Sequence, residues 1–129
     1  MKSVTISSTS ARYRQDITIN NKFHITADEP LDVGGDDTGA TPTELVLSGL
    51  GACKAITLKM YAERKGWELT HVEVNVTEEK IDGKSQILAH LHLEGNLNDE
   101  QKQRLLTIAD KCPVHKLLKS EVEIKTTLT

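Results

Sequence analysis

The chain has 129 residues, of which 37% are hydrophobic and 27% are charged, and its formal net charge is -3. This length predicts one domain over residues 1–129, with a buried core. The mixed charge and the single Trp, two Tyr and one Phe argue against a nucleic-acid or anionic-membrane surface, and the short apolar stretches argue against a membrane span.

The N-terminal third predicts strands followed by a loop. Residues 4–6, 16–19 and 22–25 alternate polar and apolar side chains, and Asn20-Asn21 is typical of a tight hairpin between the last two. No apolar signal-peptide core begins the chain, so we expect a cytoplasmic protein. Residues 28–41 combine Pro, Gly and acidic side chains, a composition that predicts a long loop.

A long apolar helix is predicted to begin at Pro42, because Pro is common at the first helical position and Thr41 and Glu44 form a start signal around it. Basic residues precede Gly66, where the helix is expected to end. Apolar side chains cover most of the helix circumference, so we expect the helix to be largely buried. One small chain has limited sheet to cover such a helix, which favours a dimer.

The second half predicts a hairpin, a helix and a final strand. Residues 71–77 and 87–93 alternate, with an Asp-Gly turn between them. Residues 98–101 resemble a capping box at the start of an amphipathic helix that ends near Cys112-Pro113. Residues 121–126 alternate as a closing strand. The order of elements predicts an α+β fold with no repeat and no linker.

Cys53 and Cys112 are the candidate reactive residues. In a cytoplasmic protein both thiols are expected to be reduced at rest, which argues against a structural disulfide. Each cysteine alone is typical of a buried structural residue, whereas two at the ends of separate helices would also suit a nucleophile and its resolving partner. Gly49 and Gly51 predict either a close packing contact or a helix break that turns backbone N–H groups toward the Cys53 sulfur.

Other chemistry is weaker. The spacing of Cys112 and His115, or the pair His90 and His92 on one strand, is compatible with metal ligands, but no further Cys pair completes a site. We therefore expect no metal and no cofactor. The Gly34-Gly35 loop carries three aspartates, which would repel phosphate.

A set of short segments carries a family resemblance. They are Asp28-Glu29-Pro30, Gly34-Gly35, Thr41-Pro42-Thr43-Glu44-Leu45, Leu50-Gly51-Ala52-Cys53, Thr57-Leu58-Lys59-Met60-Tyr61-Ala62, Arg64-Lys65-Gly66-Trp67 and Lys111-Cys112-Pro113-Val114. Together they resemble the osmotically inducible protein C and organic hydroperoxide resistance (OsmC/Ohr) family, most of all its small OsmC-like members. The resemblance implies an intertwined homodimer, in which antiparallel sheets from both chains wrap around buried central helices and two active sites lie at the interface.

The resemblance also implies thiol-dependent reduction of organic hydroperoxides. Cys53 matches the peroxidatic cysteine of the family and Cys112 the resolving one. In the family an arginine from the N-terminal strands holds the thiolate. Here Arg12 or Arg14 is the counterpart; both flank Tyr13 on a predicted strand and so share a face.

One position departs from the family pattern. The glutamate that braces the arginine directly follows the Pro that starts the helix, but Thr43 occupies that position here and the acid is Glu44. A shift of one residue turns a helical side chain by about 100°. Whether Glu44 still braces the arginine is therefore an open question.

The expected reaction begins when Cys53 attacks the peroxide and an alcohol leaves. The resulting sulfenic acid condenses with Cys112, and a cellular dithiol or low-molecular-weight thiol reopens the disulfide. Apolar walls from Leu45, Leu50 and Ile56 favour alkyl hydroperoxides over hydrogen peroxide. Two alternatives remain: a thiol redox sensor or binding module without turnover, and a structural dimer whose cysteines are core residues.

Overall fold

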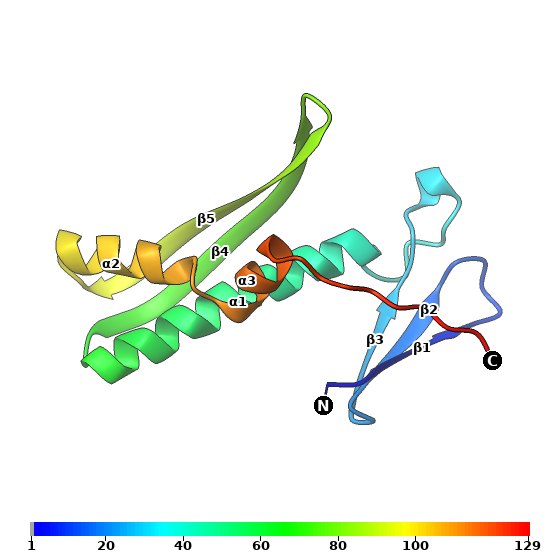
Figure 1. Ribbon diagram of the computed structural model, residues 1–129, viewed down its shortest axis with the longest axis horizontal. Helices are drawn as coiled ribbons and strands as arrows, with labels where there is room; N and C mark the ends of the chain where they lie inside the picture. The colour runs from blue at the N-terminus through cyan, green and yellow to red at the C-terminus, as the bar shows by residue number, and fades with distance from the viewer. Residues whose placement is uncertain (1) are drawn as a thin grey trace. The chain divides into compact units, whose positions relative to one another are not determined.

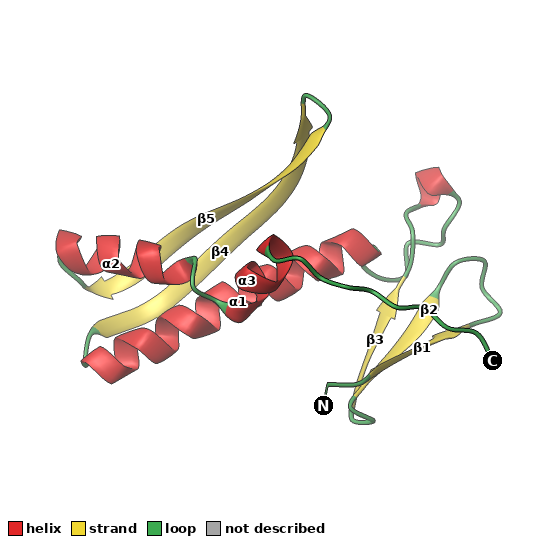
Figure 2. Ribbon diagram, viewed as in Figure 1, coloured by secondary structure: helices red, strands yellow, loops and turns green. Residues whose placement is uncertain are grey.

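The computed structural model describes residues 2–129 and divides the chain into two compact units (Figure 1). The first unit ends at Val46, and the second runs from Leu47 to Thr129. Each unit contains its own antiparallel sheet, and helical segments follow each sheet along the sequence (Figure 2). This arrangement confirms the α+β class.

The first unit contains a three-stranded antiparallel sheet in the order β1-β2-β3. The strands are Val4–Ser8 (β1), Gln15–Ile19 (β2) and Phe23–Ala27 (β3). Asn20 and Asn21 both adopt left-handed backbone conformations, with φ of 53° and 55°. Asn tolerates this conformation better than other non-glycine residues, so the predicted Asn-Asn hairpin is confirmed.

The prediction that Arg12 and Arg14 lie on a strand is wrong. Both residues lie in the connection between β1 and β2. The Thr9 hydroxyl accepts the N–H of Ala11 at 3.1 Å and donates to the carbonyl of Arg14 at 3.1 Å. Local side-chain bonds of this kind give the backbone partners other than a neighbouring strand. The two-residue period therefore does not place the two arginines on one face.

A buried carboxylate organises the loop that follows β3. Asp28 is 2% exposed, and it accepts the N–H groups of Glu29 and Thr38 as well as the Thr38 hydroxyl. The Thr38 hydroxyl is the largest of the effects that lower the pKa of Asp28 below its ordinary value. The predicted loop is thus held by one side chain near its start, and within it Leu31–Val33 forms a short 3-10 turn (η1).

Helix α1 extends from Pro42 to Lys65, as predicted. The Thr41 hydroxyl accepts the N–H of Glu44 at 3.2 Å, and the Glu44 carboxylate accepts the N–H of Thr41 at 2.8 Å. This reciprocal pair is a capping box. Gly66 follows the helix with φ of 70°, the left-handed conformation that commonly ends a helix.

Within the described chain, α1 buries one stripe of its surface. The buried residues are four apart, Leu50, Lys54, Leu58 and Ala62. Ile56 and Met60, on another side, are 55% and 61% exposed. The expectation of a largely buried helix is therefore not met by this chain alone, because the second unit covers a single stripe.

The core of the second unit lies between a long hairpin and two helices, α1 and the helix that follows the hairpin. The elements of this unit after α1 are β4 (Glu68–Ile81), β5 (Lys84–Asn96), α2 (Asp99–Ala109) and α3 (Pro113–Lys119). The core contains Leu58 of α1 and three residues of α2, Leu105, Ile108 and Ala109. Side chains of β4 and β5 pack against this cluster, including Leu91 and Leu93, whereas His90 and His92 alternate with them and are exposed.

The predicted turn and capping box of this unit are confirmed. Asp82 and Gly83 connect β4 and β5 with positive φ, and β5 runs antiparallel to β4. Asn98 and Gln101 cap α2 reciprocally, at 2.8 and 2.9 Å. The Asp-Gly pair suits positive φ, and the Asn side chain satisfies a helix N–H that has no partner within the helix.

Two expectations near the C-terminus are corrected. The chain forms a further helix, α3, directly after Cys112, because Pro113 suits a first helical position as well as it disfavours helix before it. Residues 121–126 form no strand. An alternating segment becomes a strand only when a neighbouring strand accepts its hydrogen bonds, and residues 2–129 offer it none.

Helix α1 is long and apolar enough to cross a membrane by length and composition, although the sequence predicted no such segment. A single helix of this kind is weak evidence for a membrane span, because core helices of soluble proteins have the same properties. Its buried stripe packs on the core of the second unit.

Gly51 provides a stability prediction. The helix is not broken at either glycine, but a Cβ on Gly51 would lie 3.1 Å from Cγ2 of Val76 on β4. Gly51→Leu should therefore lower the free energy of unfolding by about 1–3 kcal/mol through overpacking. Urea denaturation measures this difference.

Gly49 is the matched control, because no group in the described chain lies within 4 Å of a Cβ at this position. Gly49→Leu should raise the free energy of unfolding by up to about 1 kcal/mol through helix propensity alone. Equal stability of the two variants would show that Gly51 does not serve a close helix–strand contact.

Candidate active site

The two cysteines lie together within the second unit. Cys53 is in the middle of α1 and is half-buried, whereas Cys112 immediately precedes α3 and is fully buried. Both are free thiols, and Cys53 is near enough to Cys112 to raise the pKa of the Cys112 thiol. Fifty-nine positions of sequence therefore separate two sulfur atoms that the tertiary structure brings to one place.

The surroundings of Cys112 keep its sulfur protonated. Burial is the largest effect, and it raises the pKa of the Cys112 thiol above its ordinary value. The neighbouring Cys53 raises this pKa further, while the N–H of His115, 3.4 Å from the sulfur, and the charge of Lys54 lower it. Because the net direction is upward, Cys112 is a neutral thiol near neutral pH.

Lys54 is a buried cation beside this pair. Its side chain is 4% exposed, and its Nζ lies 3.0 Å from the carbonyl oxygen of Ala109, 3.4 Å from Oδ1 of Asp110 and 3.0 Å from Nδ1 of His115. An ammonium group has three N–H donors and no acceptor. Three acceptors match the three donors when Nδ1 of His115 carries no proton.

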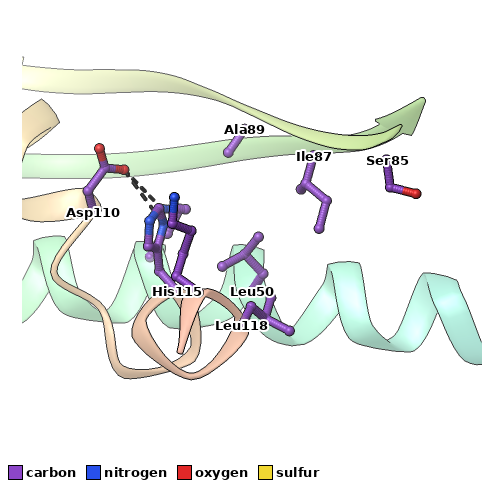
Figure 3. A pocket seen from close by; sticks show the side chains of 9 residues that line it. Leu50, Ser85, Ile87, Ala89, Asp110, His115 and Leu118 are labelled. Carbon is purple, nitrogen blue, oxygen red and sulfur yellow. Dashed lines mark hydrogen bonds and ion pairs between the residues drawn. The ribbon is translucent and has the colours of Figure 1, made fainter. Parts of the chain in front are cut away.

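A cavity of about 400 Å³ adjoins this cluster, and Figure 3 shows how β5 on one side and helices α1 and α3 on the other enclose it. Its wall is mixed, with apolar side chains beside basic and acidic groups. The lining residues are Leu50, Lys54, Ser85, Ile87, Ala89, Asp110, His115, Leu118 and Lys119. Of the three apolar residues expected to contact a peroxide, Leu50 lines this cavity.

The other two residues of that predicted wall lie elsewhere. Ile56 is exposed on α1, and Leu45 is half-buried near the start of the same helix. Neither lines the cavity beside Lys54. The apolar wall proposed for the peroxide therefore has one member at this cavity.

The arginine candidates belong to the first unit. The Arg12 guanidinium lies 5.0 Å from the centre of the Tyr13 ring. The Nε of Arg14 is 3.9 Å from an oxygen of Asp16, and it is buried without a hydrogen-bond partner among the described residues. The Arg14 side chain as a whole is 41% exposed, and a buried donor atom without a partner is uncommon.

Glu44 uses its carboxylate at the start of α1. The backbone N–H of Thr41 is the largest of the effects that lower the pKa of Glu44 below its ordinary value. Glu44, which lies one position later than the acid of the family pattern, therefore caps the start of helix α1.

Sequence reasoning missed Lys54 and Asp110, and it considered His115 only as a metal ligand. A signal for Lys54 was available, since a lysine midway between Leu50 and Leu58 interrupts an apolar stripe with a spacing of four. No comparable signal marks Asp110. Among residues 2–129, no three His, Cys, Asp or Glu side chains are grouped so as to hold a metal ion.

The fold and the paired thiols define a class of α+β proteins with two juxtaposed, reduced cysteines. The family described as OsmC-like protein matches residues 34–127 of the chain. This match covers more than half of the sequence, and the chain belongs to the OsmC-like protein family. A search of curated proteins gives no match.

Solved structures are similar in fold over nearly the whole chain. An OsmC-like protein from Mycoplasma pneumoniae has a TM-score of 0.77 and 21% identity, covering 92% of this chain and 87% of that one. The organic hydroperoxide resistance protein OhrB of Bacillus subtilis has a TM-score of 0.63 and 26% identity, covering 97% and 95%. An organic hydroperoxide resistance protein OsmC from Legionella pneumophila has a TM-score of 0.68 and 17% identity, covering 97% and 93%.

Proposed function

We propose that this protein is a thiol-dependent peroxidase that reduces organic hydroperoxides, acting as a single domain over residues 1–129 in the cytoplasm. Membership of the OsmC/Ohr family supports a peroxide-related redox role. The observation that supports the peroxidase mechanism in particular is that Cys53 and Cys112 are neighbours. A half-buried thiol beside a fully buried one suits a first attacking cysteine and a protected resolving cysteine.

The reaction that we propose has two steps on the protein. The Cys53 thiolate attacks the distal peroxide oxygen, the O–O bond breaks, and the alkoxide takes a proton to leave as an alcohol. Cys53 is thereby oxidised to a sulfenic acid. The Cys112 sulfur then displaces the hydroxyl group, which leaves with the Cys112 proton as water, and a Cys53–Cys112 disulfide remains. A dithiol or a low-molecular-weight thiol reduces this disulfide by exchange.

The first prediction for this reaction is the disulfide itself. One equivalent of an organic hydroperoxide should convert the reduced protein to a species lighter by two hydrogens, because Cys53 and Cys112 are neighbours in the folded chain. Intact-mass spectrometry with alkylation measures this change. With a dithiol present, the same protein should consume the peroxide over repeated cycles, which a redox sensor or a structural thiol pair would not do.

Single-cysteine variants identify the role of each sulfur. Cys112→Ser should hold Cys53 as a sulfenic acid that a dimedone probe captures, whereas Cys53→Ser should leave Cys112 largely unreactive because it is buried. Both thiols remaining alkylatable in the treated wild-type protein would refute the paired-cysteine mechanism.

We also propose that the protein works as a homodimer. Ile56 and Met60 leave an apolar side of α1 uncovered within the described chain. Residues 121–126 alternate like a strand but pair with no strand among residues 2–129, and Val122 and Ile124 there are 50% and 83% exposed. A second copy would cover the first surface and supply hydrogen-bond partners to the second.

Light scattering at micromolar concentration tests the dimer. The expected mass is twice the 14.3 kDa of the chain. Met60→Glu, which puts a charge on the uncovered side of α1, should weaken the dimer, while Lys59→Glu on the neighbouring exposed position should change it less. A folded wild-type monomer would contradict the proposal.

An arginine is proposed to hold the Cys53 thiolate, since a thiolate near apolar residues needs a positive partner to stay ionised. The buried Nε of Arg14, which lacks a hydrogen-bond partner in the described residues, favours Arg14 over Arg12. Arg14→Ala should slow peroxide reduction by about tenfold or more, on the order of 1.4 kcal/mol.

Stopped-flow consumption of the hydroperoxide measures this effect, and Arg12→Ala is the matched control. A larger loss in Arg12→Ala would assign the role to Arg12 instead. Unchanged rates in both single variants and in the double variant would remove arginine from the mechanism.

A further inference from the structure

A buried lysine next to a proposed resolving cysteine needs an explanation. Lys54 directly follows Cys53 in the sequence, yet its side chain belongs to the buried stripe of α1. Burying an ammonium group costs several kcal/mol unless it is well paired. A Met or Leu here would continue the apolar stripe between Leu50 and Leu58 at no such cost.

The contacts of Lys54 connect both cysteines. The ammonium group donates to Nδ1 of His115 at 3.0 Å, and the backbone N–H of the same His115 donates to Sγ of Cys112 at 3.4 Å. It also donates to the carbonyl of Ala109, three residues before Cys112. One cation on the helix of Cys53 thus holds both sides of the short segment that carries Cys112.

We propose that Lys54 is a positioning residue that holds the Cys112 sulfur next to Cys53 and, through its charge, promotes attack of that sulfur on oxidised Cys53. This inference rests on the proposed peroxidase function. The step is Cys53–SOH + Cys112–SH → Cys53–S–S–Cys112 + H₂O, in which Cys112 must give up its proton as the S–S bond forms.

The electrostatics support this role. Burial raises the pKa of Cys112, which opposes the loss of its proton, and the charge of Lys54 acts in the opposite direction. The charged and titratable groups around Lys54 and its cavity are Cys53 on α1, Asp110 before α3, and His115 and Lys119 on α3. The side chains of β5 at the cavity, Ser85, Ile87 and Ala89, do not titrate.

The test is a single-turnover experiment on Lys54→Met. Reduced protein is mixed with one equivalent of cumene hydroperoxide, quenched with acid and analysed by intact mass. Formation of the sulfenic acid, a gain of one oxygen, should slow less than the closure that follows it. Closure to the disulfide at pH 7 should slow by about tenfold, as expected for a change of about one pH unit in the ionisation of Cys112. Lys59→Met, an exposed position on the same helix, is the control and should close at the wild-type rate.

A second readout distinguishes charge from simple packing. In a Cys53→Ser background, the thiolate absorbance of Cys112 is followed against pH, with and without Lys54→Met. Loss of the charge moves the midpoint upward. If Lys54 only filled space, its removal would open the site to water, and the midpoint would move downward.

The possible outcomes separate this inference from the proposed function. If wild-type Cys53 is never oxidised, the peroxidase proposal fails. If wild type closes its disulfide and folded Lys54→Met closes it equally fast, only the role of Lys54 is overturned. If Lys54→Met does not fold, Asp110→Asn decides, because it keeps an acceptor for Lys54 and removes a negative charge: faster closure supports the inference, and unchanged or slower closure overturns it.

Discussion

The contact between helix α1 and the segment from Leu105 to His115 determines the chemistry that this protein can perform. Leu58 and Leu105 are fully buried in this contact, and burial of one such side chain contributes about 1.5–3 kcal/mol. The same contact sets the Cys112 sulfur beside Cys53, although the two residues belong to different elements. The sulfur pair is thus held by an apolar core that contains no catalytic group.

A charged group within that contact changes its character. Lys54 lies between the apolar residues of the stripe and the backbone that leads to Cys112, where its three donors all find acceptors. Lys54 is buried while its acidic partner Asp110 is 71% exposed, so the pair is weak evidence for stability: removal of the ammonium group from water offsets much of the attraction. In the role that we propose, Lys54 instead holds the Cys112 segment in place and puts a positive charge near the thiols.

The uncovered surfaces of the chain have a common physical basis. A 24-residue helix that is apolar on more than one side needs a covering layer on each, and the second unit supplies one. Residues 121–126 have strand-like alternation without a neighbouring strand. Both features are resolved by the dimer that we propose, since a second copy brings the same complementary surfaces.

Local signals in the sequence determined most of the elements. Pro42 and Gly66 set the ends of α1, Asn20-Asn21 and Asp82-Gly83 set the hairpin turns, and Asn98 set the start of α2. Each signal acts through backbone geometry or a hydrogen bond over a few residues, so it is readable without knowledge of the fold. Helix α3 was missed because Pro113 was interpreted only as a signal that ends a helix, although proline also suits the first position of a helix.

Only the tertiary structure decided which residues that are distant in the sequence lie close together. The sequence identified Cys53 and Cys112 as candidates, but it held no information on their separation in space, because that depends on how α1 packs against α2 and α3. The arginines were placed on a strand, and alternation suggested another for residues 121–126. Strand formation, however, requires a neighbouring strand, which a local sequence pattern does not contain. Lys54 lies between Leu50 and Leu58 in the sequence pattern of α1, where a lysine would ordinarily be expected at the surface. Only the packing of the neighbouring elements buries it, because burial depends on the residues that surround a side chain.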